Sequence, residues 1–380
     1  MCSIDFTREI MTSPPSKEVL NVLNYSDKIV VYGAGSVAEE VIRIINNRTK
    51  RVVGVIDPKS KKKEICGYPV AGLDDENCIL WKDLDIPLVV GIFNAFIDLD
   101  ALKKRLLEFG WKTVITFTEL HSALYSELGD RYWLTKRDFY ASHKQNLENA
   151  FTLLTDDSSR NLFKALIKYR THGDASDLPT PDIERQYFAK DLPAWIYPLR
   201  LIDCGACNGD TLDSIRKLDL NINEIYAFEP ELDNFKNLLV KLAILRKNGV
   251  KAYGFPCGVS SDTATLKFSG SGLGGALSEG GDHAVPVVDL DSMFANFNFS
   301  NDCRSSLIKM DIEGSEYDAL LGGRKIIHDI RPGLAISVYH KPSDLWELPL
   351  LIDSWNLGYD LYLRSHQYNG FDVVLYAIPK

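Results

Sequence analysis

Short apolar runs alternate with amphipathic segments along most of this chain. In the C-terminal half such runs occur at 199–203, 225–228, 251–255, 307–311 and 334–339, with helical patterns between them. This alternation is typical of buried parallel strands in a doubly wound α/β sheet. The last two runs, YDLYLRSH and FDVVLYAI, flank a polar turn and predict an antiparallel hairpin at the C-terminus.

The N-terminal third repeats the pattern on a smaller scale. The segment KIVVYGAGSVAEEVIRIINNRTKRVVGVID at 28–57 predicts strand, turn, helix and strand. We therefore expect a helical segment at 1–25, a Rossmann-like nucleotide-binding-type domain at 26–120, a helical linker at 121–198 and a larger α/β domain at 199–380.

Composition narrows the class of protein. The chain of 380 residues is long enough for two domains and carries a net charge of −9, which disfavours a general affinity for nucleic acid. Its apolar stretches are too short for a membrane span, and residues 1–12 lack a signal-peptide pattern, so we expect a cytoplasmic protein. Its seven cysteines are expected to be reduced, and the C-x-x-C pair Cys204 and Cys207, without a second pair, is interpreted as small side chains in a turn rather than a metal site.

The segment LRLIDCGACNGDT at 199–211 carries the clearest functional signal. A buried strand runs into a glycine turn, where the backbone can approach a ligand closely, and Glu229 ends the next strand, where an acid can bind ribose hydroxyls. Asp203, directly before the turn, would repel a pyrophosphate but suits a ligand with an ammonium and a sulfonium group. The pattern therefore favours S-adenosylmethionine over NAD.

Five ordered blocks then carry a family resemblance: DCGACNGDT, YAFEP, VPVVDLDSMF, LIKMDIEGSEYDALLGG and RP-x-LAISVYH. Together they resemble the FkbM-type S-adenosylmethionine-dependent methyltransferases over about 199–380. The resemblance implies a class I methyltransferase sheet and O-methylation of a sugar, a glycan precursor or a small natural product. Cys204 and Cys207 depart from the Val and Asn that such proteins commonly carry.

The same blocks suggest a cofactor site. Asp203, Gly205 and Gly209 would shape its methionine side, Asn208 would donate to the methionine carboxylate, and Glu229 would hold the ribose. The remaining candidate contacts are Ala206 in the turn, Thr211 at the helix start and Gly258 on the adenine side.

Asp311, Glu313 and His340 are the candidate catalytic residues. Asp311 ends a predicted strand at the edge where ligands of open α/β sheets bind, with Glu313 two residues on. Three interpretations remain open: Asp311 orients the methionine amino group or acceptor hydroxyl, Asp311 and Glu313 hold a divalent cation, or both cap the helix near Ser315. No metal is assigned.

His340 ends the neighbouring predicted strand, and its ordinary pKa suits a proton acceptor, although hydrogen bonding to substrate or a structural role is equally open. Asp344 is a candidate to orient it, and His366 is a weaker candidate base. Lys309, inside a strand, is expected to pair with an acid.

The N-terminal glycines leave two rival functions open. Gly33, Gly35 and Ala38 give G-x-G-x-x-A after a strand, and Asp57 ends the next one. The domain resembles Rossmann-like domains attached to bacterial sugar-modifying enzymes. The rivals are an NAD-dependent oxidoreductase using Gly33, Gly35 and Asp57, and a non-catalytic nucleotide-sugar-binding protein.

The expected partners are a small-molecule or saccharide substrate, with a homodimer as one candidate assembly. The Gly-rich stretch 270–281 is expected to be a flexible loop that orders over substrate.

Overall fold

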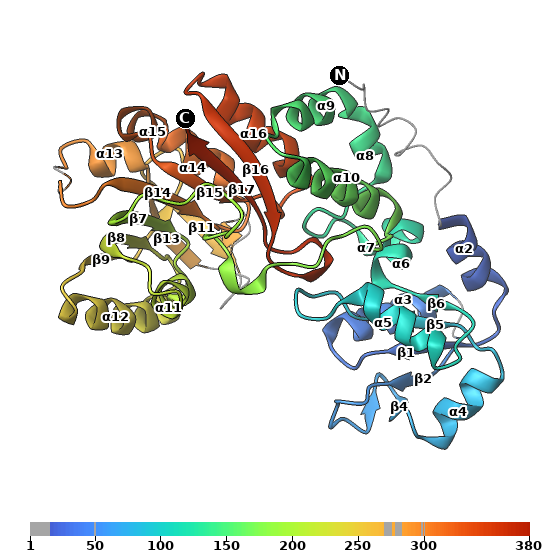
Figure 1. Ribbon diagram of the computed structural model, residues 1–380. Helices are drawn as coiled ribbons and strands as arrows, with labels where there is room; N and C mark the ends of the chain where they lie inside the picture. Colours follow the sequence, from blue (N-terminus) through green and yellow to red (C-terminus); the bar gives the residue numbers. More distant parts are fainter. Residues whose placement is uncertain (1–15, 49–50, 270–275, 278–282, 298, 300) are drawn as a thin grey trace. The chain divides into compact units, whose positions relative to one another are not determined.

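The chain forms two compact units in the computed structural model, which describes residues 16–48, 51–269, 276–277, 283–297, 299 and 301–380 (Figure 1). The first unit comprises Met1–Glu148, Asn161–Thr180 and Gln367–Phe371, and the second comprises Asn149–Arg160, Pro181–His366 and Asp372–Lys380. The segment expected as a linker, 121–198, is divided between the two units. Of the expected N-terminal helical segment, α2 (Ser16–Tyr25) is described and the residues before it are not.

The first unit is built on a six-stranded sheet in the order β3-β4-β2-β1-β5-β6. Neighbouring strands are parallel except β3 and β4. The strands are β1 (Ile29–Tyr32), β2 (Val52–Ile56), β3 (Glu64–Ile65), β4 (Tyr68–Ala71), β5 (Leu88–Val90) and β6 (Val114–Ile115). The helices are α3 (Ser36–Arg48), α4 (Glu76–Asp83), α5 (Leu99–Glu108), α6 (Phe117–Ala123), α7 (Tyr125–Leu128), α8 (Arg137–Ser142), and parts of α9 (Lys144–Leu153) and α10 (Asp157–His172).

Periodic apolar positions of α5 explain how this sheet is covered. Leu99, Leu102 and Leu106 recur at helical spacing and are buried in one cluster with Val30 and Leu88 of the sheet. Asp98 caps the helix by accepting a hydrogen bond from the Ala101 amide. The N-terminal region is therefore a Rossmann-like α/β domain, as the sequence predicted.

The second unit contains a seven-stranded sheet in the order β16-β17-β15-β14-β7-β8-β9. All neighbours are parallel except β17, which is antiparallel to both β15 and β16. The strands are β7 (Leu199–Cys204), β8 (Ile222–Phe228), β9 (Lys251–Phe255), β14 (Ser305–Met310), β15 (Gly333–Ser337), β16 (Tyr359–Ser365) and β17 (Val373–Pro379). The doubly wound sheet and its terminal hairpin are confirmed.

Strand order reverses between β7 and β14, because the chain winds from β7 to β9 on one side and from β14 onward on the other. Ligands of open α/β sheets bind at such a switch point, outside the carboxyl ends of the strands. The helices of this unit are α11 (Asp210–Lys217), α12 (Leu232–Lys247), α13 (Leu290–Phe294), α14 (Glu316–Gly322), α15 (Arg324–Ile330) and α16 (Asp344–Ser354).

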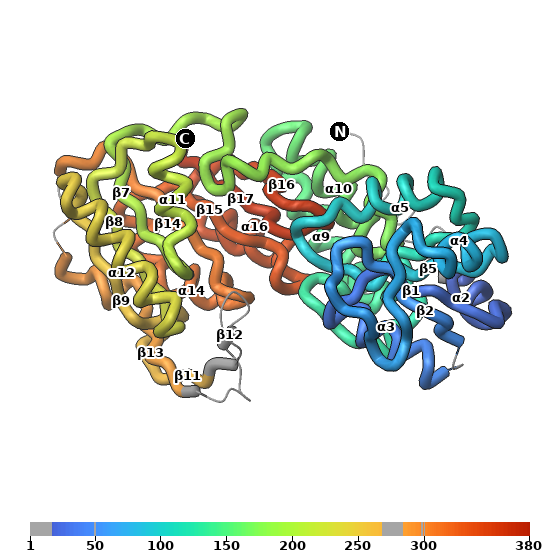
Figure 2. The backbone as a smooth tube through the Cα atoms, turned by 90° about the horizontal axis from the view of Figure 1, so that it is seen from below, coloured from blue at the N-terminus to red at the C-terminus, as the bar shows by residue number. Residues whose placement is uncertain are grey.

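A second, four-stranded sheet was not anticipated from the sequence. It has the order β10-β13-β11-β12, from β10 (Gly258–Val259), β11 (Ala264–Ser269), β12 (Ala276–Leu277) and β13 (His283–Val288). Figure 2 shows β11, β12 and β13 together at one end of this unit. Within the stretch expected to be a Gly-rich loop, 276–277 pair with β11 instead, and the rest of that stretch lies outside the described residues.

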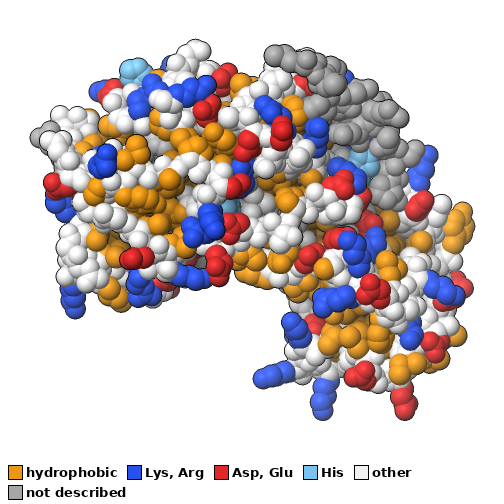
Figure 3. All heavy atoms as spheres, in the orientation of Figure 1, with side chains coloured by type: hydrophobic (Ala, Val, Ile, Leu, Met, Phe, Trp, Pro, Cys, Tyr) orange, Lys and Arg blue, Asp and Glu red, His pale blue; other side chains and the backbone are white. Residues whose placement is uncertain are grey.

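The visible surface mixes charges of both signs. Figure 3 shows Lys and Arg interspersed with Asp and Glu over the face drawn, so this face carries no broad field of one sign. Among the described residues, every helix falls short of the length and apolar character that a membrane span requires.

Candidate functional site

The turn after β7 is shaped by glycines. Gly205 has φ +79°, and a Cβ there would lie 1.9 Å from the carbonyl oxygen of Asp311. The amides of Gly205 and Ala206 both donate to the Phe228 carbonyl, which ties the turn to β8. Only glycine fits position 205, and the turn consequently brings β7 against the residue that follows β14.

The helix after this turn begins one residue earlier than expected. Gly209, with φ +84°, is the N-cap of α11, so Thr211 is the second helical residue. Thr211 is buried, and its Oγ1 makes no hydrogen bond within the described part of the chain. Asn208, the other predicted contact in this turn, is half-buried beside Gly209.

Glu229 directly follows β8, and its side chain is hydrogen-bonded to the turn that follows the neighbouring strand β7. Its Oε2 accepts from the Cys207 amide at 2.8 Å, and its Oε1 accepts from the Glu231 amide at 2.7 Å. Burial raises the pKa of Glu229, and the two amides oppose that shift. Each carboxylate oxygen keeps a second lone pair, so the side chain still has acceptor capacity.

Asp203 and Lys309 form a buried ion pair beneath the turn. Lys309 Nζ lies 3.0 Å from Asp203 Oδ1 and donates to the Gly205 carbonyl at 2.5 Å. Burial lowers the pKa of Lys309, but Asp203 and Asp311 outweigh it and raise that pKa. Asp203 Oδ2 is buried and accepts no hydrogen bond from the described residues, so it is a polar atom without a protein partner there.

Asp311 follows β14 directly, one residue beyond the strand end rather than at it. The Tyr187 hydroxyl donates to Oδ2 at 2.6 Å, and the Tyr339 hydroxyl donates to Oδ1 at 3.4 Å. Burial raises the pKa of Asp311, but His340, Lys309 and the Tyr187 hydrogen bond together lower it below the ordinary value. Asp311 is therefore held ionised.

His340 lies three residues beyond β15 and faces three carboxylates. Its Nδ1 is 2.9 Å from Glu316 Oε1, and its Nε2 is 3.3 Å from Asp311 Oδ1 and 3.7 Å from Glu313 Oε2. Burial lowers the pKa of His340, but Glu316, Asp311 and Glu313 raise it to about 10. An ordinary imidazole pKa, the basis for expecting a proton acceptor, does not describe this arrangement.

Further acids surround this histidine. Burial, with Asp311 and Glu316 nearby, raises the pKa of Glu313 to about 7. Burial also raises the pKa of Asp372 and of Asp344 to about 7, with Asp311 and Glu316 respectively adding to the effect. Several carboxyl groups thus share one small volume.

Two sequence-based alternatives for this region are not seen. Asp344 accepts from the Lys341 amide at 2.6 Å, and it is Glu316 that contacts His340 Nδ1. Ser315 is the N-cap of α14 and makes no side-chain cap hydrogen bond. His366 has both ring nitrogens engaged, by the Asp182 carbonyl and the Tyr376 hydroxyl, each at 2.7 Å.

Four non-glycine residues around the site adopt left-handed backbone conformations. The φ angles are +67° at Tyr187, +46° at Cys207, +55° at Glu313 and +47° at Asp372. Such residues cost about 1–3 kcal/mol each and persist only where the surrounding structure holds them. Four such residues lie around this site. The fold therefore keeps the geometry of the site at a cost in the free energy of unfolding.

Glu316 and Asp372 are the site residues that sequence reasoning missed. Glu316 lies in the same KMDIEGSE block as Asp311, so its position in that block was a usable signal. Asp372 lies 61 positions from Asp311 (372 − 311), and no local pattern marks it.

Gly258, the predicted adenine-side residue, starts β10 in the small sheet. A Cβ there would lie 3.2 Å from Val287 Cγ1, so close strand packing also accounts for this glycine. Cys204 and Cys207 are free thiols, as are the other described cysteines. Burial raises the pKa of the Cys207 thiol to about 11, which makes it a poor nucleophile or metal ligand.

In the first unit, the carboxylate of Asp57 is hydrogen-bonded to the glycine loop. Asp57 Oδ2 accepts from the Ala34 amide at 2.9 Å, and its Oδ1 accepts from the Lys59 and Ser60 amides at 3.0 Å. Lys62 Nζ donates to the Ala34 carbonyl at 3.0 Å. Asp57 therefore already holds the turn together.

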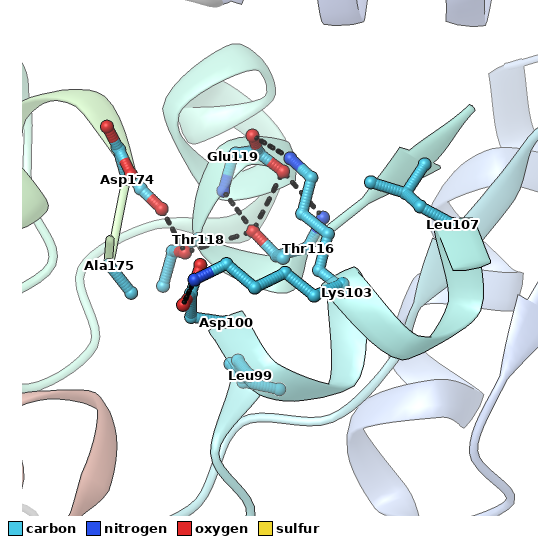
Figure 4. Close-up of a pocket in the computed structure, with 11 residues that line it drawn as sticks. Leu99, Asp100, Lys103, Leu107, Thr116, Thr118, Glu119, Asp174 and Ala175 are labelled. Atoms are coloured by element: carbon cyan, nitrogen blue, oxygen red, sulfur yellow. Dashed lines mark hydrogen bonds and ion pairs between the residues drawn. The ribbon is translucent and has the colours of Figure 1, made fainter. Parts of the chain in front are cut away.

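A separate pocket in this unit lies beside α5 and α6 (Figure 4). Its polar side chains are engaged with one another: Lys103 Nζ contacts Glu119 Oε1 at 2.6 Å, and Glu119 Oε2 accepts from the Thr116 amide at 2.8 Å. The latter is half of a capping box for α6. The glycine turn after β7 and the acids around His340, all in the second unit, make the stronger candidate site.

Comparison with known proteins agrees with this placement. Residues 203–368 match the methyltransferase FkbM domain, and residues 28–97 match the PglD N-terminal domain. The crystal structure of methyltransferase FkbM from Methylobacillus flagellatus KT is similar, with a TM-score of 0.76 and 20% identity over 98% of this chain and 95% of that chain. A search of curated proteins gives no match. Residues 203–368 of this chain therefore carry a methyltransferase FkbM domain, and a Rossmann-like domain precedes it.

Proposed function

We propose that the protein is an S-adenosylmethionine-dependent O-methyltransferase whose acceptor is a hydroxyl of a sugar, a glycan precursor or a small natural product. One observation carries the proposal: the glycine turn of β7 lies directly against Asp311. The Gly205 Cα is so close to the Asp311 carbonyl that a Cβ would collide with it. The predicted cofactor residues and the predicted acceptor residues therefore adjoin at the switch point of the sheet.

The residues around the turn fit such a cofactor. Asp203 Oδ2 and Thr211 Oγ1 are buried polar atoms without hydrogen-bond partners among the described residues, and Glu229 retains acceptor capacity. We assign Glu229 to the ribose hydroxyls, Asp203 to the methionine side, and Gly205, Ala206, Asn208, Gly209 and Thr211 to the wall of the pocket. When bound, the cofactor supplies an electrophilic methyl group on a positively charged sulfur.

We assign Asp311, Glu313 and His340 to binding of the acceptor hydroxyl. Their carboxylate oxygens and ring nitrogen converge within 3.7 Å of His340 Nε2, so an alcohol placed there meets several hydrogen-bonding atoms at once. These groups orient the hydroxyl for in-line transfer, which is a task that methyl transfer leaves to the protein. Tyr187 positions Asp311 by its hydrogen bond.

The acceptor class is inferred from the family resemblance and from the first unit. That unit has a glycine loop of the kind that accommodates nucleotides, so it is assigned to a nucleotide-linked saccharide or to assembly. Because Asp57 holds its own loop, loss of ligand binding in an Asp57 variant would not separate contact with ligand from damage to the turn. Titration of the wild-type chain with NAD and with nucleotide-sugars is the cleaner comparison.

The test is transfer of labelled methyl from S-adenosylmethionine to a panel of nucleotide-sugars and glycan precursors, read as a mass gain of one methylene. We expect transfer with the wild type, and its loss in Glu229→Ala and Asp311→Ala. Glu184→Ala, which changes an exposed acid paired with Lys217, is the matched control. Failure of the chain to bind S-adenosylmethionine in calorimetry would overturn the proposal. NAD binding in its place would favour the oxidoreductase, and binding of a nucleotide-sugar alone would favour a non-catalytic binding protein.

A further inference from the structure

His340 has the surroundings of a metal-ligating imidazole. Its Nδ1 lies 2.9 Å from Glu316 Oε1, and the Ile312 amide donates to the same oxygen at 2.8 Å. Both side chains are almost wholly buried, with exposed fractions of 3% for His340 and 1% for Glu316. Histidines that bind metals almost always direct the second ring nitrogen at a carboxylate or carbonyl, which fixes the tautomer and the ring orientation.

The other ring nitrogen, Nε2, is aimed into a group of carboxylates without bonding to any of them. Asp311 Oδ1 is 3.3 Å away and Glu313 Oε2 is 3.7 Å away. Nevertheless, Nε2 makes no hydrogen bond within the described part of the chain. A buried imidazolium would be expected to donate to Asp311 from this atom, and it does not.

The separations match those between ligands of one cation. Metal–ligand bonds of ~2.1 Å put adjacent ligand atoms ~3.0 Å apart in an octahedron and ~3.4 Å apart in a tetrahedron. The Nε2 distance to Asp311, 3.3 Å, lies between these two values, and the distance to Glu313, 3.7 Å, is a few tenths of an ångström above them. One ligand atom from each of Asp311, Glu316 and His340 also lies within 4.8 Å of the others, a group that does not include Glu313.

Asp311 Oδ1 is the carboxylate oxygen that lies 3.3 Å from His340 Nε2. Its Oδ2 is occupied by the Tyr187 hydroxyl at 2.6 Å, whereas the contact of Oδ1 with the Tyr339 hydroxyl is long, at 3.4 Å. Five carboxyl groups, Asp311, Glu313, Glu316, Asp344 and Asp372, lie around His340.

We propose that Asp311 Oδ1, Glu313 Oε2 and His340 Nε2 bind a divalent cation, with Glu316 as the residue that orients the imidazole. A divalent cation held by Asp311 and Glu313 was one of the three interpretations that the sequence left open, although no metal was assigned. Two carboxylates with one imidazole suit a cation that accepts both oxygen and nitrogen, such as Mn²⁺, better than Ca²⁺, which takes oxygen ligands.

The role of this cation rests on the proposed function. It would bind the acceptor hydroxyl and lower the hydroxyl pKa. The hydroxyl proton would leave to water, the C–O bond would form as the C–S bond breaks, and the sulfur would keep the electron pair of that bond.

The direct test is Mn²⁺ binding to the chelator-treated full-length protein, followed by electron paramagnetic resonance of the free ion. We expect one site per chain, with affinity reduced about 10-fold or more in His340→Gln and Asp311→Asn, and by about 10-fold in Glu316→Gln. His328→Gln, which alters an exposed histidine beside Asp329, is the matched control and should leave binding unchanged. Circular dichroism of each variant checks folding.

A second measurement avoids mutation. Electron spin echo modulation of the wild-type Mn²⁺ complex should reveal ¹⁴N coupling from one imidazole. No Mn²⁺ binding at millimolar concentration, binding without ¹⁴N coupling, or a folded His340→Gln variant with wild-type affinity would overturn the proposal. Calorimetry with S-adenosylmethionine separates the two ideas: cofactor binding without Mn²⁺ binding defeats the cation site alone, and Mn²⁺ binding without cofactor binding defeats the proposed function alone.

Discussion

The Tyr187 hydroxyl donates a 2.6 Å hydrogen bond to Asp311 Oδ2, joining two residues that are 124 positions apart in the sequence. Tyr187 is buried in this contact, and Lys309 Nζ lies 5.2 Å from the centre of its ring. The hydroxyl fixes which carboxylate oxygen of Asp311 faces His340. Tyr187 is therefore a positioning residue for Asp311.

Tyr187→Phe should lower kcat/KM for methyl transfer about 10- to 100-fold, because hydrogen bonds to charged groups contribute about 1.5–3 kcal/mol. The loss should fall on kcat, with S-adenosylmethionine affinity unchanged, since the hydroxyl that is removed bonds to Asp311. Tyr253→Phe, on the exposed side of β9, is the control. An equal loss of cofactor affinity would show that Tyr187 supports the whole pocket instead.

Glu229→Gln should weaken S-adenosylmethionine binding about 10- to 100-fold, as measured by calorimetry. The substitution replaces a carboxylate that accepts charge-assisted hydrogen bonds with an amide that has one acceptor oxygen. Glu231→Gln, two residues on, changes an acid that bonds to the Asn234 amide at the start of α12, and cofactor affinity should stay near the wild-type value. Equal effects of the two substitutions would contradict the ribose assignment.

Gly205→Ala should destabilise the protein by more than about 3 kcal/mol in denaturant unfolding, because it combines a left-handed backbone with a collision at the Asp311 carbonyl. Gly249→Ala separates the two effects. Gly249 has φ +89°, but a Cβ added there would meet nothing within 4 Å, so its cost should be about 1–2 kcal/mol. Similar losses for both variants would mean that the close approach at Gly205 is not tight in solution.

Lys309→Met should cost about 3–5 kcal/mol, because it leaves Asp203 buried and without its counter-charge. The double variant Lys309→Met/Asp203→Asn should lose less than the sum of the two single variants, measured as free energy of unfolding. Lys236→Met, which breaks an exposed pair with Asp233, should change stability by no more than about 0.5 kcal/mol. Strict additivity in the double variant would indicate that the buried pair is not coupled.

The strands were predictable where burial on both faces leaves an apolar run. β7 is buried at every residue and extends one residue beyond the predicted end. β9, a partly exposed edge strand, also lies at 251–255 as predicted. The four-stranded sheet was not predicted, for two physical reasons. β13 carries Pro286, which argues against a strand, and β10 is only two residues long. A sheet of short strands leaves too little periodicity to detect.

The candidate site likewise contains residues that could be placed from the sequence and residues that could not. Gly205 and Glu229 follow strands directly and could be placed from the sequence, because the carboxyl ends of parallel strands share one edge. Glu316 reads locally as an acid in the first turn of a helix, a common and favourable position. Its contact with His340 depends on how the segments after β14 and β15 fold toward each other, which no spacing in the sequence specifies.

The short connection between β16 and β17 has a consequence for how the chain reaches its final form. Residues 367–371 belong to the first unit, where Asn369 donates to the Asn94 and Ile97 carbonyls and accepts from the Leu99 amide. β17 then returns to the second unit and inserts between β15 and β16. A nascent chain cannot complete that sheet until residues 373–379 have left the ribosome, and a stop codon before 367 would remove ordered contacts from both units at once.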